Sequence, residues 1–204
     1  MLAGAGELDP ASVDPDPIAQ FRAWFAAARD AGIYEPEAMT VSTVGADGRP
    51  SSRFVLLRGL DERGFAFFTN YTSAKGRALE AHPYAALTFG WLTIHRSVRV
   101  EGPVERLPEH ESDTYFASRP RGAQLGAWAS PQSSVLSERD ELDRALAEAE
   151  RRFEGGPVAR PPHWGGFLVR PERIELWEGR PNRLHDRVRY TRAGDGWRIE
   201  RLAP

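Results

Sequence analysis

The 204-residue sequence contains no cysteine and no long apolar run, and these absences exclude several classes of protein. Without cysteine, the chain can form no disulfide framework, no thiolate metal site and no cysteine nucleophile. No apolar run approaches the ~20 residues that a membrane-spanning helix needs. Residues 1–17 are acidic and lack the basic-then-apolar plan of a signal peptide. We therefore expect a cytoplasmic protein with no membrane partner.

The sequence also lacks an excess of either charge sign, because 27 Lys and Arg face 29 Asp and Glu. A chain without a basic excess has no global field that attracts nucleic acid. Its five histidines are scattered, and no spacing among them predicts a zinc site. Walker, dinucleotide-glycine and Gly-x-Ser-x-Gly motifs are missing as well. We expect no metal and no nucleic-acid partner.

An apolar fraction of 41% is enough for one packed core. Asp16 and Pro17 are typical of a helix start, and apolar residues at helical spacing follow as far as Gly32. Between Met39 and Gly102, short β-branched and aromatic runs alternate with turn signals. This pattern predicts an antiparallel sheet curled into a barrel.

Helices and strands alternate with turns along the rest of the chain. We expect helices over 73–82 and 108–118 and from Ser137 onward, and strands over 166–169, 174–177, 184–190 and 197–201. The fold class is therefore mainly β (α+β). Residues 1–15 are predicted to be a flexible arm, and 16–204 a single domain.

The segment from Arg183 to Arg187 is a candidate ligand site. On a strand, alternate side chains share one face, so Arg183, His185 and Arg187 would project together. Three cationic or titratable groups on one face are costly unless they meet anions or water. An anionic ligand explains them, and so does a solvated edge strand.

Three further segments could bind an anion or a heteroaromatic ring. Lys75 and Arg77 follow a strand-to-helix junction, where free amides attract phosphate, although a capped surface helix has the same pattern. Tyr115 and Arg119 are four residues apart, so on a helix they could hold a phosphate or pack together. The polar, uncharged stretch 124–134 could bond a flat heteroaromatic edge, or be a loop.

Taken together and in this order, the motifs resemble the pyridoxamine/pyridoxine 5′-phosphate oxidase family, over about residues 16–204. The stretches that begin at Leu125, Pro162 and Arg183 are specific to that family. The matching stretches are Arg53-Phe-Val-Leu-Leu57, Phe68-Thr-Asn-Tyr71, Tyr115-Phe-Ala-Ser-Arg-Pro-Arg121, Leu125-Gly-Ala-Trp-Ala-Ser-Pro-Gln-Ser133, Pro162-His-Trp-Gly-Gly166, Arg183-Leu-His-Asp-Arg187 and the C-terminal Trp197-Arg-Ile-Glu-Arg-Leu-Ala-Pro204.

The resemblance implies a split β-barrel homodimer with flavin mononucleotide (FMN) at the subunit interface. It also implies a reaction of vitamin B6 metabolism. Pyridoxine or pyridoxamine 5′-phosphate is oxidised to pyridoxal 5′-phosphate, with O2 as electron acceptor and H2O2 as product. The flavin carries the redox chemistry, and the protein binds and orients the flavin and the substrate.

Site residues follow from the resemblance position by position. Arg58, Tyr115 and Arg119 match substrate-phosphate contacts, and Arg183 and His185 match residues over the substrate ring that act in catalysis. The positions that match flavin contacts are Arg53, Phe54, Val55, Leu56, Leu57, Arg58, Phe68, Thr69, Lys75, Gln132, Ser133, Trp177 and Arg187.

The chain departs from the family pattern at five positions. Arg58 stands where Lys is usual, Ala74 where an Arg helps to hold the flavin phosphate, Ser97 where a Gln contacts flavin, Ala123 where a Ser meets the substrate phosphate, and Phe68 where Tyr is usual. Arg77, one turn from Ala74, could compensate. Two alternatives stay open: a related flavin oxidoreductase acting on another substrate, such as a phenazine precursor, and a non-enzymatic protein that binds flavin or pyridoxal phosphate.

Overall fold

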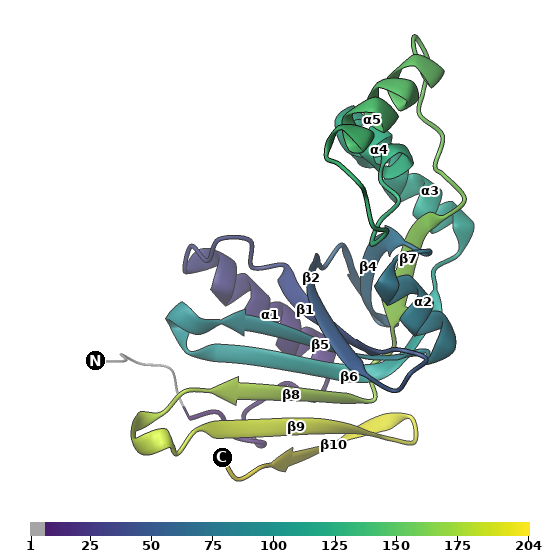
Figure 1. Cartoon of the computed structure of the whole chain (residues 1–204). Coiled ribbons are helices and arrows are strands. Elements are labelled where there is room, and N and C mark those ends of the chain that lie inside the picture. Colours follow the sequence, from purple (N-terminus) through teal and green to yellow (C-terminus); the bar gives the residue numbers. More distant parts are fainter. Residues whose placement is uncertain (1–6) are drawn as a thin grey trace.

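The structure is a computed structural model that describes residues 7–204. Figure 1 shows a curled antiparallel sheet from which an arm of helices projects at one end. The α-helices are α1 (Pro17–Asp30), α2 (Ala74–Ala81), α3 (Glu109–Ser118), α4 (Arg121–Ala129) and α5 (Asp140–Arg152). The strands are β1 (Ala38–Val44), β2 (Pro50–Leu56), β3 (Gly59–Asp61), β4 (Gly64–Asn70), β5 (Tyr84–Trp91), β6 (Arg96–Arg106), β7 (Trp164–Val169), β8 (Arg173–Glu178), β9 (Asp186–Ala193) and β10 (Gly196–Arg201).

The long strand β6 joins the two parts of the sheet. Its first half pairs with β5 and β8 in the order β10-β9-β8-β6-β5-β1-β2, and its end pairs with β7, which also pairs with β4. Gly102 lies between the two halves, where a Cβ atom would stand 1.8 Å from the Arg170 carbonyl oxygen. The absence of a side chain there lets β6 pass close to the connection between β7 and β8, where the sheet curls. The predicted barrel with peripheral helices is confirmed as a half-barrel.

The core lies inside the curl and is closed by α1. Phe21 on α1 packs edge-on against Phe65 and Phe89, with ring centroids 4.9 Å apart in both pairs. As predicted, the Asp16 side chain caps α1, accepting a hydrogen bond from the Ile18 amide at 2.9 Å. This helix is therefore stabilised by a local N-cap and by the burial of its apolar face against the barrel.

The helical arm has a second core of its own, built from Phe116, Leu125, Ala149, Val158 and Trp164. The interpretation of 124–134 as a loop was wrong for its first half, because α4 buries Leu125 and Ala129 there. The third predicted helix also starts later than expected. Helix α5 begins at Asp140, and the Ser137 amide and hydroxyl both bond to the Glu141 side chain in its first turn.

The described part of the predicted N-terminal arm, residues 7–15, packs on the barrel. Leu8 is buried in the core, and Arg201 Nη2 lies 2.8 Å from Asp9 Oδ2 and 3.0 Å from Glu7 Oε1. Residues 1–6 of that arm lie outside the described residues. Within 7–204, no helix is long and apolar enough to cross a bilayer.

Candidate functional site

Three predicted flavin residues from distant segments meet at the junction of β4 and α2. Lys75 Nζ donates to Thr69 Oγ1 at 3.0 Å and to Gln132 Oε1 at 2.8 Å. Thr69 Oγ1 also donates to Gln132 Oε1 at 2.9 Å. Lys75 is buried, with 8% of its surface exposed. The fold thus brings the segment after α4 onto the start of α2.

Positive charge gathers at this junction without a carboxylate to balance it. Burial, with the charge of Arg53 as the second cause, lowers the pKa of Lys75 to about 8. Arg53 donates to Thr43 Oγ1 at 2.8 Å and to Ser51 Oγ at 2.6 Å, and burial lowers its pKa too. In the described part of the chain, neither cation forms an ion pair. Two close cations held by neutral groups are suited to an anionic ligand.

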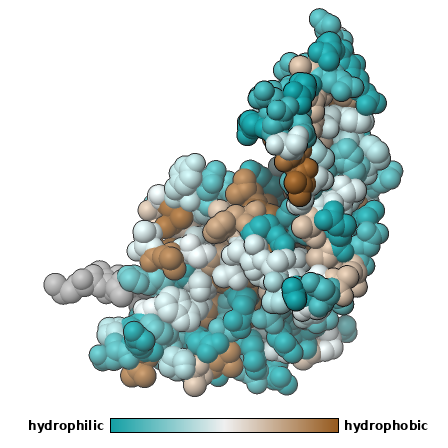
Figure 2. Space-filling model, in the orientation of Figure 1, coloured by the Kyte–Doolittle hydropathy of each residue, from teal (hydrophilic) through white to brown (hydrophobic). Residues whose placement is uncertain are grey.

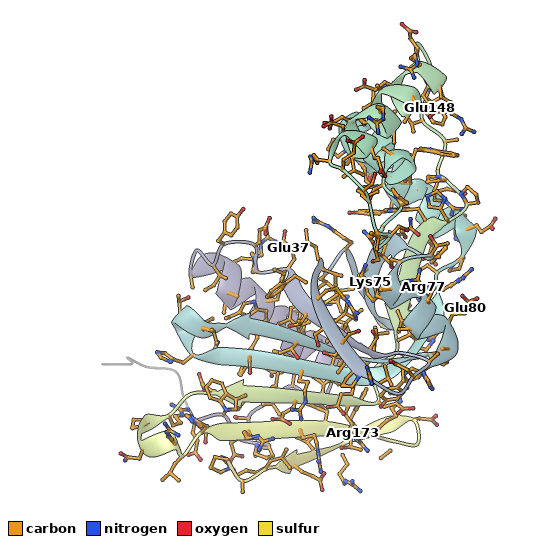
Figure 3. The ribbon with its side chains drawn as sticks, in the orientation of Figure 1. Glu37, Lys75, Arg77, Glu80, Glu148 and Arg173 are labelled. Carbon is orange, nitrogen blue, oxygen red and sulfur yellow. The ribbon has the colours of Figure 1, made fainter. Side chains whose placement is uncertain are left out.

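The N-terminus of α2 completes this site. Ser73 caps the helix by accepting from the Gly76 amide at 3.2 Å, and a Cβ atom on Gly76 would stand 2.0 Å from the Tyr71 carbonyl oxygen. Figure 3 shows Lys75 and Arg77 on the same short helix. The exposed Arg77 guanidinium donates to the Thr72 carbonyl oxygen.

A second cluster lies where the helical arm meets the barrel. Phe68 stacks on Tyr115 with ring centroids 4.0 Å apart, and Trp164 lies parallel to both rings. The Arg119 guanidinium lies 4.7 Å from the Trp164 ring centroid. Arg119 Nη1 is buried without a hydrogen-bond partner in the described structure. Buried donors in proteins are almost always hydrogen-bonded, so this atom is suited to donate to an acceptor on a ligand.

The sequence predicted that Tyr115 and Arg119 lie on one face of a helix, and the structure contradicts this. Helix α3 ends at Ser118, and Arg119 adopts an extended conformation after it. Pro120 explains this ending, because a residue before proline is disfavoured in the helical region. Burial lowers the pKa of Arg119, Tyr115 opposes the shift, and the charge of Arg58 adds to it. Tyr115 and Arg58 thus both lie close enough to Arg119 to influence its charge.

A third cluster lines a cavity of about 460 Å³ on the outer face of β8 and β9, and includes Trp177, His185, Arg187 and Ser97. The rings of Trp177 and His185 have centroids 4.7 Å apart. Arg187 Nε donates to Glu175 Oε1 at 2.8 Å, and this carboxylate raises the pKa of Arg187.

The prediction that Arg183 and His185 lie on a strand was wrong. Strand β9 begins only at Asp186, and Pro181–Arg183 forms a 3-10 turn. Asn182 and Arg183 both have left-handed φ angles, 59° and 61°. Asp186 explains the late start, because its buried carboxylate binds Arg180 Nε at 2.6 Å. His185 and Arg187 share the cavity, and Arg183 lies exposed on the turn outside its lining.

His185 is held by its own loop. Its Nδ1 atom accepts from the Arg180 amide at 3.1 Å, which leaves Nε2 as the ring atom that can carry the proton of a neutral imidazole. His185 therefore satisfies a neighbouring backbone group and still has a second polar atom for a ligand.

Most of the remaining predicted flavin residues lie at the end of β2 or just after it, and their burial increases along the chain. Phe54 is 82% exposed, Val55 packs against the core and Leu57 is buried. Leu56 is half-buried, and Ser133 is exposed with a φ angle of 72°.

The sequence interpretation missed Trp164 and Glu175 as part of these clusters. The signal for Glu175 was its position two residues before Trp177 on one strand face. Within residues 7–204, no hydrogen bond, ion pair or ring contact joins the cavity residues Trp177, His185 and Arg187 to Lys75 or Arg119. Figure 2 shows hydrophobic side chains on both sides of the concave surface between arm and barrel. A single chain thus presents the clusters separately.

Comparisons with known proteins agree with this architecture. The family model described as pyridoxamine 5′-phosphate oxidase matches residues 25–153, and the pyridoxine 5′-phosphate oxidase C-terminal dimerisation region matches residues 164–204. The chain is 62% identical to the pyridoxine/pyridoxamine 5′-phosphate oxidase of Rubrobacter xylanophilus, over 94% of this chain and 88% of that protein. Identity to the protein of the same name from Synechocystis sp. is 54%, over 98% of this chain and 93% of that one.

Solved structures give the same result for the fold. PhzG from Burkholderia lata, in complex with tetrahydrophenazine-1-carboxylic acid, is 31% identical, with a TM-score of 0.92 over 100% of both chains. A pyridoxamine 5′-phosphate oxidase-related, FMN-binding protein from Nostoc punctiforme has the same fold at 19% identity, with a TM-score of 0.72 over 90% of this chain and 97% of that one. The chain thus belongs to the pyridoxamine 5′-phosphate oxidase family.

Proposed function

We propose that this protein is an FMN-dependent oxidase that converts pyridoxine or pyridoxamine 5′-phosphate to pyridoxal 5′-phosphate, with O2 as electron acceptor. One observation supports this most strongly: in the described structure, cations lie at two places without carboxylates to pair with them. One place holds the buried Lys75 with the partly buried Arg53, and the other holds Arg119, whose Nη1 atom is buried. FMN and the substrate each carry one phosphate, so the reaction needs two anion sites. The family membership supports the same function.

The residues at the β4–α2 junction suit the phosphate of FMN. Lys75 and Arg53 would supply positive charge, Thr69 and Gln132 would supply polar contacts, and the start of α2 adds free amides. Flavin held by these residues would supply the redox chemistry, as acceptor of a hydride from the 4′ carbon of the substrate and donor of the electrons to O2, with H2O2 as product. Ala74 offers no charge at this site, and Arg77 is engaged by a backbone carbonyl.

The residues at the base of the arm suit the substrate. Arg119 would bond the substrate phosphate through its unpartnered Nη1, with Arg58 adding charge and Tyr115 a hydroxyl. His185 would bond the polar edge of the pyridine ring through Nε2, and Arg183 would hold the 4′ substituent. These residues act by orientation, and small displacements then have large rate costs.

We also propose that the active unit is a homodimer in which each flavin contacts both chains. Trp177 and Arg187 lie on the outer face of β8 and β9, within the segment that matches a dimerisation region. A partner subunit could bring these residues to the flavin held by Lys75. Light scattering would test this, and a flavin-loaded monomer would refute it.

A related oxidase acting on a phenazine precursor is the second candidate, because the PhzG structure carries tetrahydrophenazine-1-carboxylic acid and covers the whole chain. That ligand carries a carboxylate and no phosphate, whereas Arg58, Tyr115 and Arg119 suit a phosphate ester. We further propose a cytoplasmic location, in line with the absence of cysteine.

The decisive experiment combines a spectrum with a turnover assay. Purified protein should show flavin absorbance and release H2O2 with pyridoxine or pyridoxamine 5′-phosphate. Turnover of the tetrahydrophenazine alone would favour the second candidate. Bound flavin without turnover of any of these compounds would favour a protein that binds flavin without oxidising them.

A further inference from the structure

Arg58 has one carboxylate partner in the described structure, and the pair is loose. Arg58 Nη1 lies 3.8 Å from Glu37 Oε1, beyond hydrogen-bond distance, with side chains 37% and 29% exposed. Such partly exposed pairs are weak, so a ligand with more charge can replace the carboxylate. Arg29 lines the same surface pocket as Glu37 and Arg58.

The backbone holds Glu37 beside the end of β2. The Leu57 amide donates to the Glu37 carbonyl oxygen at 2.9 Å, and the Arg58 amide donates to the Ala66 carbonyl oxygen at 2.8 Å. Arg58 thus lies between the loop that carries Glu37 and the strand that carries Phe68. Figure 3 shows Glu37 at the upper rim of the barrel.

Backbone geometry also connects Arg58 to the proposed site for the substrate phosphate. Its amide bonds to Ala66 on β4, and Phe68, two residues further along that strand, stacks on Tyr115. Burial lowers the pKa of Arg119, and the charge of Arg58 adds to this shift.

Within residues 7–204, Arg119 forms no ion pair. Among Arg58, Tyr115 and Arg119, only Arg58 pairs with a carboxylate, and that carboxylate belongs to Glu37. A phosphate bound by both arginines must compete with Glu37.

We propose that Glu37 is a specificity-determining residue whose carboxylate competes with the substrate phosphate for Arg58. The competition weakens the binding of phosphate esters and of inorganic phosphate and leaves the binding of uncharged ligands unchanged, so Glu37 sets how strongly the site favours a phosphorylated ligand. This inference rests on the proposed function, because it takes Arg58 as a phosphate contact.

The test compares Glu37→Gln with Glu80→Gln in the flavin-loaded protein. Glu80 is a suitable control because it forms a similarly loose pair, 3.9 Å from Arg106 Nη2, on α2. We expect Glu37→Gln to lower the KM for pyridoxine 5′-phosphate and the inhibition constant of inorganic phosphate about three- to tenfold, with the effect on KM rather than kcat. Inhibition by unphosphorylated pyridoxine should not change. Glu80→Gln should behave as wild type.

Calorimetric titration with pyridoxal 5′-phosphate and with inorganic phosphate gives the same comparison without turnover. An unchanged or raised KM in an active Glu37→Gln protein would overturn the competition. If no variant oxidised a vitamin B6 phosphate, the proposed function would be wrong. Calorimetry would then decide about Glu37: tighter phosphate binding in Glu37→Gln supports the competition, and equal binding overturns it.

Discussion

Lys75 is the only lysine in the sequence, so its ionisation can be measured without interference from other lysines. Burial lowers its pKa from 10.5 to about 8, with Arg53 as the second cause. We expect Lys75 to titrate near pH 8 in the flavin-free protein. Bound FMN should raise that pKa, because the phosphate stabilises the charged amine.

The shift has a defined sign for stability. Lys75 has a lower pKa in the folded than in the unfolded chain, so between pH 8 and 10.5 the unfolded state holds more protons. The free energy of unfolding of the flavin-free protein should therefore rise with pH. From pH 7 to 9 the Lys75 contribution is roughly 1–2 kcal/mol.

The affinity for FMN should fall as the pH rises. If the phosphate needs a charged Lys75, binding at pH 9 includes the cost of protonating it. The dissociation constant of FMN should then rise about tenfold between pH 7 and 9. A Lys75→Met variant keeps the length and loses the charge, so both pH dependences should be flatter in it. Its FMN affinity at pH 7 should be about ten- to a hundredfold lower.

Nuclear magnetic resonance of protein labelled with 13C-lysine is the direct assay, because one Cε signal reports one residue. Chemical denaturation at several pH values measures the free energy of unfolding, and FMN titration at the same pH values measures the free energy of FMN binding. Lys75→Met is the control for both. A Lys75 pKa near 10.5 without flavin would refute the burial argument. Equal pH dependence of FMN binding in wild type and Lys75→Met would remove Lys75 from the phosphate site.

Three other predictions follow from the clusters. Arg119→Ala should raise the KM for pyridoxine 5′-phosphate about ten- to a hundredfold and change FMN binding little; lost FMN with an unchanged KM would assign Arg119 to the cofactor. Ala74→Arg should tighten FMN binding, measured by fluorescence titration, and an unchanged dissociation constant would mean that Arg77 or another group already fills that role. Arg183→Ala and His185→Ala should each lower kcat/KM at least about tenfold with an unaltered flavin spectrum. Wild-type flavin reduction rates in both, followed by stopped flow, would exclude them from the mechanism.

Short-range physical chemistry made much of the fold predictable from the sequence alone. Asp16 and Pro17 start α1, and Ser73 caps α2, because a cap involves residues only two or three positions apart. Two of the turn signals between Met39 and Gly102, at 46–48 and 61–64, likewise form hairpin turns, between β1 and β2 and between β3 and β4. The motif order was enough to identify the family.

Tertiary structure decided the features that depend on distant partners. Helix α4 contains Gly122 and Gly126, which lower its helix propensity, and it forms where Leu125 can pack in the second core. The start of β9 depends on Asp186, which pairs with Arg180 and also with Arg201 at 3.0 Å. Lys75 meets Gln132 across 57 positions. Only a folded chain makes such contacts, because loop closure and burial, rather than local propensity, determine which side chains meet.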